Sequence, residues 1–200
     1  MLREKEAQYG KQIFLISDET YRKITYDKLK YPTALHYHHQ SIIVTSHSKD
    51  LALPGERIGC IAAHLDYRQQ EELINGLIFC NRTLGYVNAP ALMQHIVRHL
   101  QHVTISVNEY QRKRDFLYDY LVKTGYSVIK PQGAFYMFPK SPLKDDVAFV
   151  KGLQQWKVLT VPGRGFGAPG YFRISYCVDD KTLEGSLAGF AKLAQKSSLC

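Results

Sequence analysis

The stretch that decides the fold and the chemistry of this chain is Thr45-Ser-His-Ser-Lys-Asp-Leu-Ala-Leu-Pro-Gly-Glu-Arg-Ile-Gly-Cys60. The β-branched run 42–45 predicts a short buried strand, and the Pro-Gly pair predicts a turn before a second short apolar segment, 58–63. Between them lie two hydroxyls, an amine and, at Arg57, a guanidinium. A lysine near a second cation at a strand end is favoured in its neutral, nucleophilic form, and hydroxyls with a guanidinium suit a phosphate monoester. An isolated lysine is more often a solvated loop residue, so the assignment depends on its neighbours.

Those neighbours carry a resemblance to a known family. Ser46-x-Ser48-Lys49, with Arg57 eight residues after the lysine and then Gly59, resembles the cofactor-lysine segment of the fold-type I pyridoxal-phosphate-dependent aminotransferases of class I/II, the aspartate aminotransferase family. The resemblance implies that Lys49 is catalytic and carries pyridoxal 5'-phosphate as a Schiff base. It also implies that Ser46 and Arg57 hold the cofactor phosphate, whereas Ser48 is implied only as a small residue beside the lysine.

A second motif lies earlier in the chain. The apolar run 13–16 predicts a buried strand that ends in the polar cluster Ser17-Asp18-Glu19-Thr20-Tyr21, and ligands bind at the carboxyl ends of strands in open α/β sheets. A polar residue here also suits a simple helix cap. The family that the chain resembles has Asp-x-x-Tyr on this strand, which implies that Asp18 accepts the proton of the pyridinium nitrogen and Tyr21 hydrogen-bonds the phenolic oxygen. A carboxylate in that place keeps the ring protonated and able to accept electrons.

The rest of the chain predicts mostly helices divided by short strands. Helices are predicted over 69–85, 145–155 and 180–195, and strands over 126–130, 131–139, 158–161 and 171–176. A single long helix is predicted over about 91–123, with one buried apolar face made of Leu92, Ile96, Leu100, Val103, Val107 and Tyr110.

Arg173 stands in the middle of the last predicted strand, where a guanidinium is costly to bury without an anion. The loop and strand around it, Pro-Gly-x-x-Phe-Gly and then Tyr-x-Arg-x-Ser, resemble the same family. The resemblance implies that Arg173 binds the α-carboxylate of the substrate in a bidentate pair. A structural salt bridge is the alternative, and Arg164 in the loop is a weaker candidate.

The resemblance covers nearly all 200 residues but matches only the second half of such an enzyme. It implies an α/β fold in which residues 1–88 form the C-terminal part of the cofactor-binding large domain, a mostly parallel sheet with helices. Residues 89–200 are then a long linking helix and a small α+β C-terminal domain. We therefore expect an aminotransferase that is truncated and impaired as this chain, whether from a truncated gene, a fragment or a split protein. The alternatives are a non-catalytic remnant of such an enzyme and a pyridoxal-phosphate-dependent lyase on the same fold.

The net charge and the apolar content limit the classes of partner that the chain is expected to bind. The net charge of +8 permits a nucleic-acid or anionic-membrane partner, but the densest basic cluster, 112–114, lies in a predicted helix and indicates a solvated face. No apolar run approaches the ~18 residues that span a bilayer. We therefore expect no nucleic acid and no membrane, an amino acid and a 2-oxo acid as small-molecule partners, and by resemblance a homodimer.

The cysteines and histidines predict neither a disulfide framework nor a metal site. Cys60, Cys80, Cys177 and Cys200 are far apart, which indicates reduced thiols in a cytoplasmic protein. The histidines within 36–39 have no Cys, Asp or Glu at ligand spacing, so they predict a surface loop.

Overall fold

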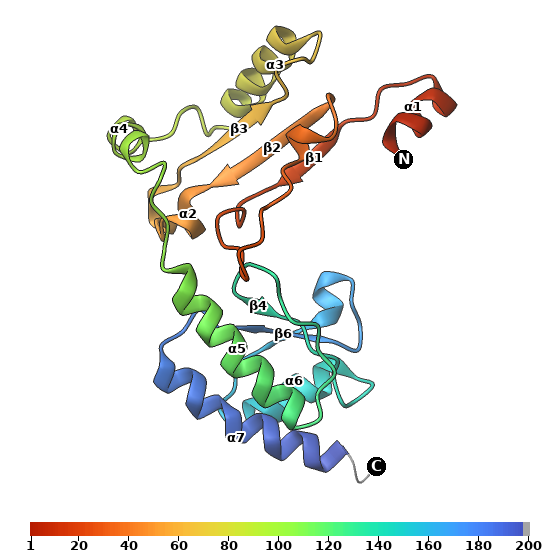
Figure 1. Cartoon of the computed structure of the whole chain (residues 1–200), viewed down its shortest axis with the longest axis vertical. Helices are drawn as coiled ribbons and strands as arrows, with labels where there is room; N and C mark the ends of the chain where they lie inside the picture. The colour runs from red at the N-terminus through yellow and green to blue at the C-terminus, as the bar shows by residue number, and fades with distance from the viewer. Residues whose placement is uncertain (198–200) are drawn as a thin grey trace. The chain divides into compact units, whose positions relative to one another are not determined.

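The β-branched run 42–45 lies in the middle strand of a three-stranded sheet in the computed structural model, which describes residues 1–197 and the side chains of residues 1–194. The chain divides into two compact units, the first ending at Ile105 and the second beginning at Ser106. In chain order, the first unit contains α1 (Leu2–Tyr9), β1 (Leu15–Asp18), the 3-10 turn η1 (Ala34–His36), β2 (Ser41–Ser46), α2 (His47–Asp50), the 3-10 turn η2 (Pro54–Glu56), β3 (Gly59–Ala63), α3 (Gln70–Thr83) and α4 (Ala91–His99) (Figure 1). The second contains α5 (Val107–Lys123), β4 (Tyr136–Met137), α6 (Asp146–Gln154), β5 (Val161–Pro162), the 3-10 turn η3 (Gly163–Phe166), β6 (Phe172–Ser175) and α7 (Asp180–Ser197).

The sheet of the first unit has the order β1-β2-β3, with β1 and β2 parallel and β2 and β3 antiparallel. The prediction of a mostly parallel sheet is therefore wrong for the described strands, which form one parallel and one antiparallel pair. The reason is the short connection from β2 to β3: it holds only the single turns α2 and η2, so the chain reverses and pairs with itself. Because β1 and β2 are parallel, Asp18 and Ser46, the last residues of the two strands, lie toward the same edge.

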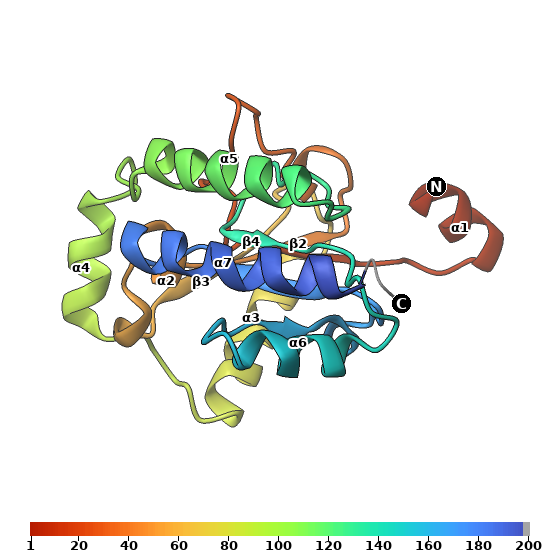
Figure 2. The same cartoon turned by 90° about the horizontal axis from the view of Figure 1, so that it is seen from below.

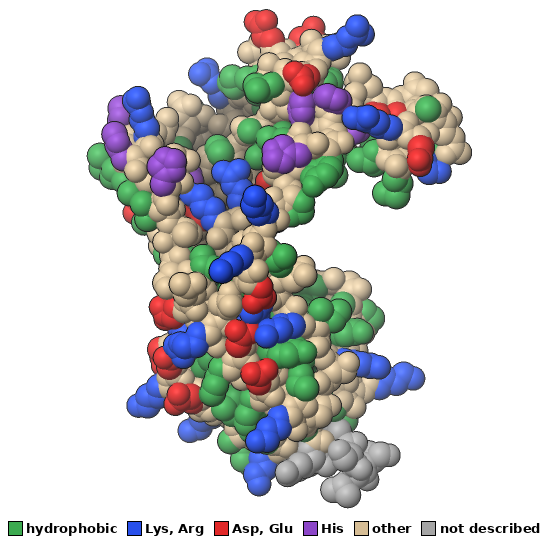
Figure 3. Space-filling view, in the orientation of Figure 1, with side chains coloured by type: hydrophobic (Ala, Val, Ile, Leu, Met, Phe, Trp, Pro, Cys, Tyr) green, Lys and Arg blue, Asp and Glu red, His purple; other side chains and the backbone are tan. Residues whose placement is uncertain are grey.

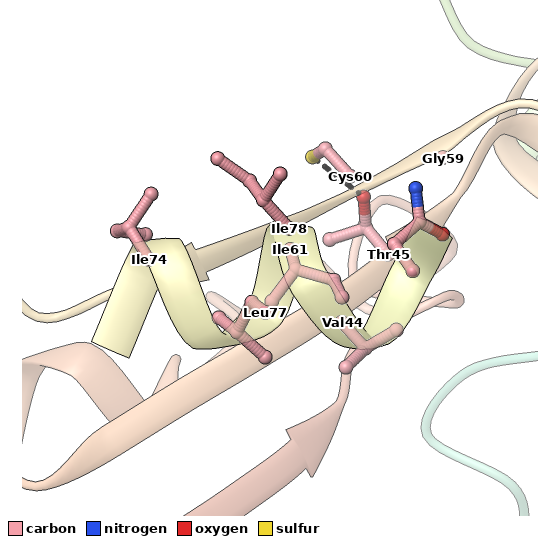
Figure 4. Close-up of a pocket in the computed structure, with 9 residues that line it drawn as sticks. Val44, Thr45, Gly59, Cys60, Ile61, Ile74, Leu77 and Ile78 are labelled. Atoms are coloured by element: carbon pink, nitrogen blue, oxygen red, sulfur yellow. Dashed lines mark hydrogen bonds between the residues drawn. The ribbon is translucent and has the colours of Figure 1, made fainter. Parts of the chain in front are cut away.

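Helix α3 packs against β2 and β3 without closing over them. None of its fourteen residues, all of them described, is buried. Its apolar side chains Ile74, Leu77 and Ile78 line a hollow of about 340 Å³ together with residues of the two strands, among them Val44 and Ile61 (Figure 4). Apolar surface of β2, β3 and α3 therefore stays partly open to solvent.

The single helix predicted over 91–123 is wrong: α4 ends at His99 and α5 begins at Val107. The segment between them is held by Asp50, whose backbone carbonyl accepts hydrogen bonds from the amide of Ile105 (2.8 Å) and the hydroxyl of Thr104 (3.1 Å). Three consecutive β-branched residues, 103–105, also disfavour a helix at this point.

The break also changes which face of α4 is buried. Met93 and Val97 pack with Ile58 and the residues around it, whereas Leu92, which we placed on the buried face, is 70% exposed. The prediction of one apolar face over 92–110 is wrong because it assumes a continuous helix, whereas α4 ends at His99. The units divide at 105/106, so α4 belongs to the first of them, and the assignment of 1–88 and 89–200 to a large and a small domain stays a prediction.

The second unit has an antiparallel sheet of order β4-β6-β5 with α7 beside both α5 and α6 (Figure 2). Its core is aromatic: the ring of Tyr126 makes edge contacts with Phe149, Phe172 and Phe190 at centroid distances of 6.0 to 6.2 Å. The Tyr126 hydroxyl donates to the carbonyl of Phe190 (2.9 Å), and burial raises the pKa of Tyr126. The strand predicted over 126–130 is not formed, since Tyr126 enters this core instead.

The basic cluster 112–114 is not the solvated face that the sequence indicated. Lys113 and Arg114 are both buried on α5. Arg114 donates to the carbonyl of Pro131 (2.8 Å), and Lys113 donates to the carbonyl of Val178 (2.6 Å), while Arg112 pairs with Asp180. On the face of this unit seen in Figure 3, charges of both signs are interspersed.

None of the helices within residues 1–197 is long and apolar enough to cross a membrane. Cys60, Cys80 and Cys177 are free and exposed, and Cys200 lies outside the described residues.

Asp146 and Arg164 form an ion pair that joins the start of α6 to the loop before β6. The fully buried Asp146 carboxylate accepts the Arg164 Nε–H and the Arg164 amide, both at 2.8 Å, and Arg164 also pairs with Asp145. Arg164, the weaker substrate candidate, thus has two acidic partners within its own unit. The hydrogen bond from its guanidinium holds the pKa of Asp146 below the usual range.

We expect this pair to make the second unit sensitive to acid. A carboxyl whose pKa is lower in the folded than in the unfolded chain contributes stability above its unfolded pKa of about 3.9, and loses it as the pH falls through the folded value. Asp146→Asn should lower the free energy of unfolding at pH 7 and flatten its dependence on pH below about 4. Urea unfolding followed by circular dichroism measures both. Asp119→Asn, at an exposed carboxylate of α5, is the control; a pH dependence of the Asp146 variant equal to that of the parent chain contradicts the expectation.

Candidate functional site

Asp18 and Tyr21 lie where β1 ends. The Asp18 side chain is exposed, and its carboxylate accepts a hydrogen bond from the amide of Thr20 (3.2 Å). This bond folds the turn that carries Tyr21, which is half-buried. Asp18 therefore caps a turn, as the simpler interpretation expected, and its side chain stays exposed to solvent.

Lys49 lies in α2, the single turn that follows β2. Ser46 caps this turn: its hydroxyl accepts the amide of Ser48 (3.2 Å) and donates to the Ser48 hydroxyl (2.8 Å). Lys49 Nζ lies 6.0 Å from the centre of the Tyr21 ring. Residues separated by 28 positions in the sequence are thus neighbours at the edge where the parallel strands end.

Arg57 lies beyond η2 in a left-handed backbone conformation (φ 49°). Its side chain is exposed, and Nη1 donates to the carbonyl of Pro54 (2.9 Å). The next carbonyl, that of Ile58, accepts the amide of His47 (3.1 Å), so the backbone after Arg57 runs beside the lysine segment. The guanidinium carries four N–H groups besides the one that donates to Pro54, and these are the donors with which it would bind a phosphate.

A buried ionic network supports the lysine segment, and sequence reasoning missed it. The Asp50 carboxylate lies 3.2 Å from both His47 Nδ1 and Lys23 Nζ, and Lys23 also donates to the carbonyl of Gln101 (2.8 Å). Asp50 directly follows Lys49, so the network fixes the turn that carries the amine. The only sequence signal was a charged residue after a strand, with a partner 27 residues away.

Glu19 is a second buried acid at this edge that sequence reasoning left without a role. It is 1% exposed, and its Oε1 accepts the hydroxyl of Thr33 (3.0 Å) and the amide of Ala34 (2.9 Å). Its amide donates to the carbonyl of Val44 in β2 (2.8 Å). Glu19 therefore fastens the long loop after β1 to the sheet and fixes the position of Asp18 beside it.

Arg173 belongs to the second unit, where it lies on β6. Its guanidinium carbon lies 4.5 Å from the centre of the Tyr136 ring and 4.2 Å from that of Phe166. Cation–π contacts with two rings stabilise a positive charge in mid-strand without an acid. They also leave the N–H groups at the edge of the guanidinium plane, which is the geometry that binds a carboxylate.

The residues of the first unit suit a phosphorylated pyridine aldehyde. An amine next to a tyrosine ring, a carboxylate at the end of the adjacent strand, and two hydroxyls 2.8 Å apart match the groups that such a molecule presents. The set of side chains therefore fits pyridoxal phosphate. The guanidinium of Arg57 donates one hydrogen bond to the carbonyl of Pro54 in this structure.

A family model for aminotransferase class I and II matches residues 6–189. The chain belongs to this aminotransferase family. A probable aspartate aminotransferase of Methanocaldococcus jannaschii is 34% identical over 185 residues, which cover 88% of this chain and 48% of the relative. A probable N-acetyl-LL-diaminopimelate aminotransferase of Bacillus subtilis is 29% identical over 184 residues, which cover 89% and 46%.

Solved aminotransferase structures agree with the family. A crystal structure of an amino transferase from Eubacterium rectale superposes with a TM-score of 0.94 at 41% identity, over 98% of this chain and 49% of that one. An aspartate aminotransferase of Thermotoga maritima, at 22% identity, shows the same fold with a TM-score of 0.79. The chain has an α/β fold of the fold-type I aminotransferases and spans about half the length of these relatives. Members of the family generally use pyridoxal phosphate, act on amino and oxo acids, and are dimeric.

Proposed function

We propose that this chain carries the cofactor-binding and substrate-binding residues of a pyridoxal-phosphate-dependent aminotransferase, which passes an amino group from an α-amino acid to a 2-oxo acid. The observation that carries the proposal is the placement of Lys49 Nζ 6.0 Å from the Tyr21 ring, at the edge where β1 and β2 end. We assign residues 1–88 to the C-terminal part of the large domain and 89–200 to the linking segment and small domain of such an enzyme. A cytoplasmic homodimer completes the proposal.

Each residue takes the role that the resemblance to the family implies, and its chemistry is compatible with that role. Pyridoxal phosphate, when bound, supplies an aldehyde and an electron-accepting ring. Lys49 holds the cofactor and moves a proton from the substrate Cα. Asp18 accepts a hydrogen bond from the protonated ring nitrogen, and Tyr21 donates to the phenolic oxygen. Ser46 and Arg57 bind the phosphate.

Arg173 completes the assignment on the second unit. Its guanidinium binds the α-carboxylate of the substrate, while Tyr136 and Phe166 hold the guanidinium plane from its faces. This role needs no acidic partner for Arg173 in the resting protein, which distinguishes it from Arg164 with its two aspartates.

We propose that the 200-residue chain is impaired as an enzyme. The support is that it spans about half of each relative and leaves apolar surface between α3 and the sheet open. A non-catalytic remnant is the second candidate, and the span of about half of each relative favours it.

Cofactor binding separates the two candidates. Pyridoxal phosphate is titrated into the purified chain by absorption spectroscopy, and borohydride reduction followed by peptide mass spectrometry identifies the lysine that carries it. We expect stoichiometric label at Lys49, none at that position in Lys49→Ala, and unchanged label in Lys151→Ala, an exposed lysine of α6. Arg57→Ala should weaken binding about tenfold, the effect of losing about 1.4 kcal/mol of phosphate contact. Label spread over other lysines, or no uptake, overturns the proposed cofactor site at Lys49 and leaves the non-catalytic remnant of the family.

A further inference from the structure

We propose that His39, His64 and Asp66 form a binding site for a divalent transition-metal ion, with Zn²⁺ as the best match. The site lies at the end of the first unit's sheet opposite to Lys49. It is independent of the proposed function, because none of its residues takes part in the cofactor site.

The antiparallel pairing of β2 and β3 brings the three residues together. His39 precedes β2, whereas His64 and Asp66 follow β3, and Ile42 stands opposite Ala63 in the register. The amide of His64 donates to the carbonyl of Ser41 (3.1 Å), which extends the ladder to the point where the histidines meet. His39 is 25 positions before His64, so the sequence alone shows no acid at ligand spacing from the histidines at 36–39. The pairing of β2 with β3 brings Asp66 close to His39.

The three side chains converge on one point. The rings of His39 and His64 lie 4.7 Å apart at 70°, and Asp66 Oδ2 is 3.9 Å from His39 Nδ1 and 4.0 Å from His64 Nδ1. One ligand atom from each residue lies within 4.8 Å of the other two. Bonds of about 2.0–2.1 Å in a tetrahedron place ligand atoms about 3.4 Å apart. The imidazole nitrogens, which lie within 4.8 Å of each other, must therefore approach by up to about 1.4 Å, and Asp66 must approach each of them by about half an ångström. Asp66, with a side chain 74% exposed, is free enough to make that movement.

The ligand set selects the class of ion. Two imidazoles and one carboxylate suit Zn²⁺ and other borderline transition metals, and they leave a fourth position for water. Ca²⁺ and Mg²⁺ prefer sets made of oxygen alone. Side-chain exposure is 16% at His64 and 51% at His39, so an ion reaches the site from solvent while one ligand stays anchored in the fold.

Metal binding at His64 Nδ1 would replace one hydrogen bond within the chain. His64 Nδ1 accepts the amide of Asp66 (3.0 Å), and a metal bound at that nitrogen displaces this donor. The cost is small, since Asp66 is exposed and its amide can turn to water.

The position of the site separates it from the cofactor chemistry. His39 lies before the first residue of β2 and Ser46 is the last of its six residues, so about 20 Å of strand lies between them. Bound metal would therefore clamp the β2–β3 pair and not act on the cofactor. Histidine side chains also gather elsewhere on the face shown in Figure 3, which calls for a control histidine in any test.

Isothermal titration of the untagged chain with Zn²⁺ tests the proposal. We expect binding with one ion per chain, no comparable binding of Mg²⁺, and a rise in thermal unfolding temperature with Zn²⁺. His39→Ala and Asp66→Asn should each weaken the affinity at least about tenfold and abolish the rise. His99→Ala, at an exposed histidine of α4, should change the affinity less than about twofold.

Circular dichroism of each variant without metal establishes that it is folded, and the conservative Asp66→Asn keeps the test available if His39→Ala is not. Absence of one-to-one binding, equal binding by Asp66→Asn and the parent chain, or an equal loss in His99→Ala overturns the site.

Discussion

Gly59→Ala is expected to destabilise the first unit by at least about 2 kcal/mol and to loosen β3 from the sheet. A Cβ at position 59 would lie 2.3 Å from the carbonyl oxygen of Thr45 and 3.1 Å from the Cα of Ser46. Both are backbone atoms, so no side chain can move to relieve the contact, and the strands themselves must separate. Because Gly59 stands opposite Ser46, the separation begins where the lysine segment leaves β2.

Two measurements follow the effect. Urea unfolding gives the loss of stability, and hydrogen exchange gives its location: the amide of His47, which donates to Ile58 (3.1 Å), should exchange faster in the variant. Gly55→Ala is the matched control, since a Cβ there meets open space; its stability should stay within about 0.5 kcal/mol of the parent chain. If both variants melt alike and the His47 amide is unchanged, the close approach of the two strands is wrong.

The features that the sequence predicts well are those whose causes lie within a few residues. The β-branched run 42–45 before Lys49 forms part of β2, as predicted. The helices at 146–154 and 180–197 begin after aspartates that cap or flank them. The motif Ser46-x-Ser48-Lys49 folds into a capped turn on its own hydrogen bonds.

The predictions that are wrong share one cause: each depends on a contact with residues far away in the sequence. The break in the helix predicted over 91–123 depends on the carbonyl of Asp50, which lies more than 50 positions away and holds Thr104 and Ile105. Burial of Arg114 depends on the carbonyl of Pro131, and the histidine–aspartate cluster depends on strand pairing. Local patterns of charge and hydropathy contain no information about such partners. The sequence therefore offers candidate cofactor residues, which stay predictions, but not the groups that hold them in position.

Asp50→Ala is expected to cost about 2–3 kcal/mol of stability in the first unit. The Asp50 side chain is 9% exposed and pairs with Lys23 and His47. Its removal leaves the Lys23 ammonium, 22% exposed, beside the carbonyls of Gln101 and Val103 and without its acidic partner. Breaking a fully buried pair costs about 3–5 kcal/mol, and the partial exposure of Lys23 reduces the figure. Urea unfolding measures it, with Glu56→Ala, at an exposed acid of the same segment, as the control that should change little.

The same substitution tests whether the network positions the lysine turn as well as stabilising it. The backbone carbonyl of Asp50 holds the amide of Ile105 at 2.8 Å, so loosening the turn should speed exchange of that amide along with those of α2. Asp50→Asn keeps the shape and a hydrogen bond to His47 but removes the charge, so it should restore the Ile105 protection only in part. Lys23→Met combined with Asp50→Ala should cost less than the sum of the single changes, because no unpaired charge remains. Additive costs, with the Ile105 amide unaffected in every variant, would show that Lys23 and Asp50 act separately and that their ion pair does not hold the lysine turn.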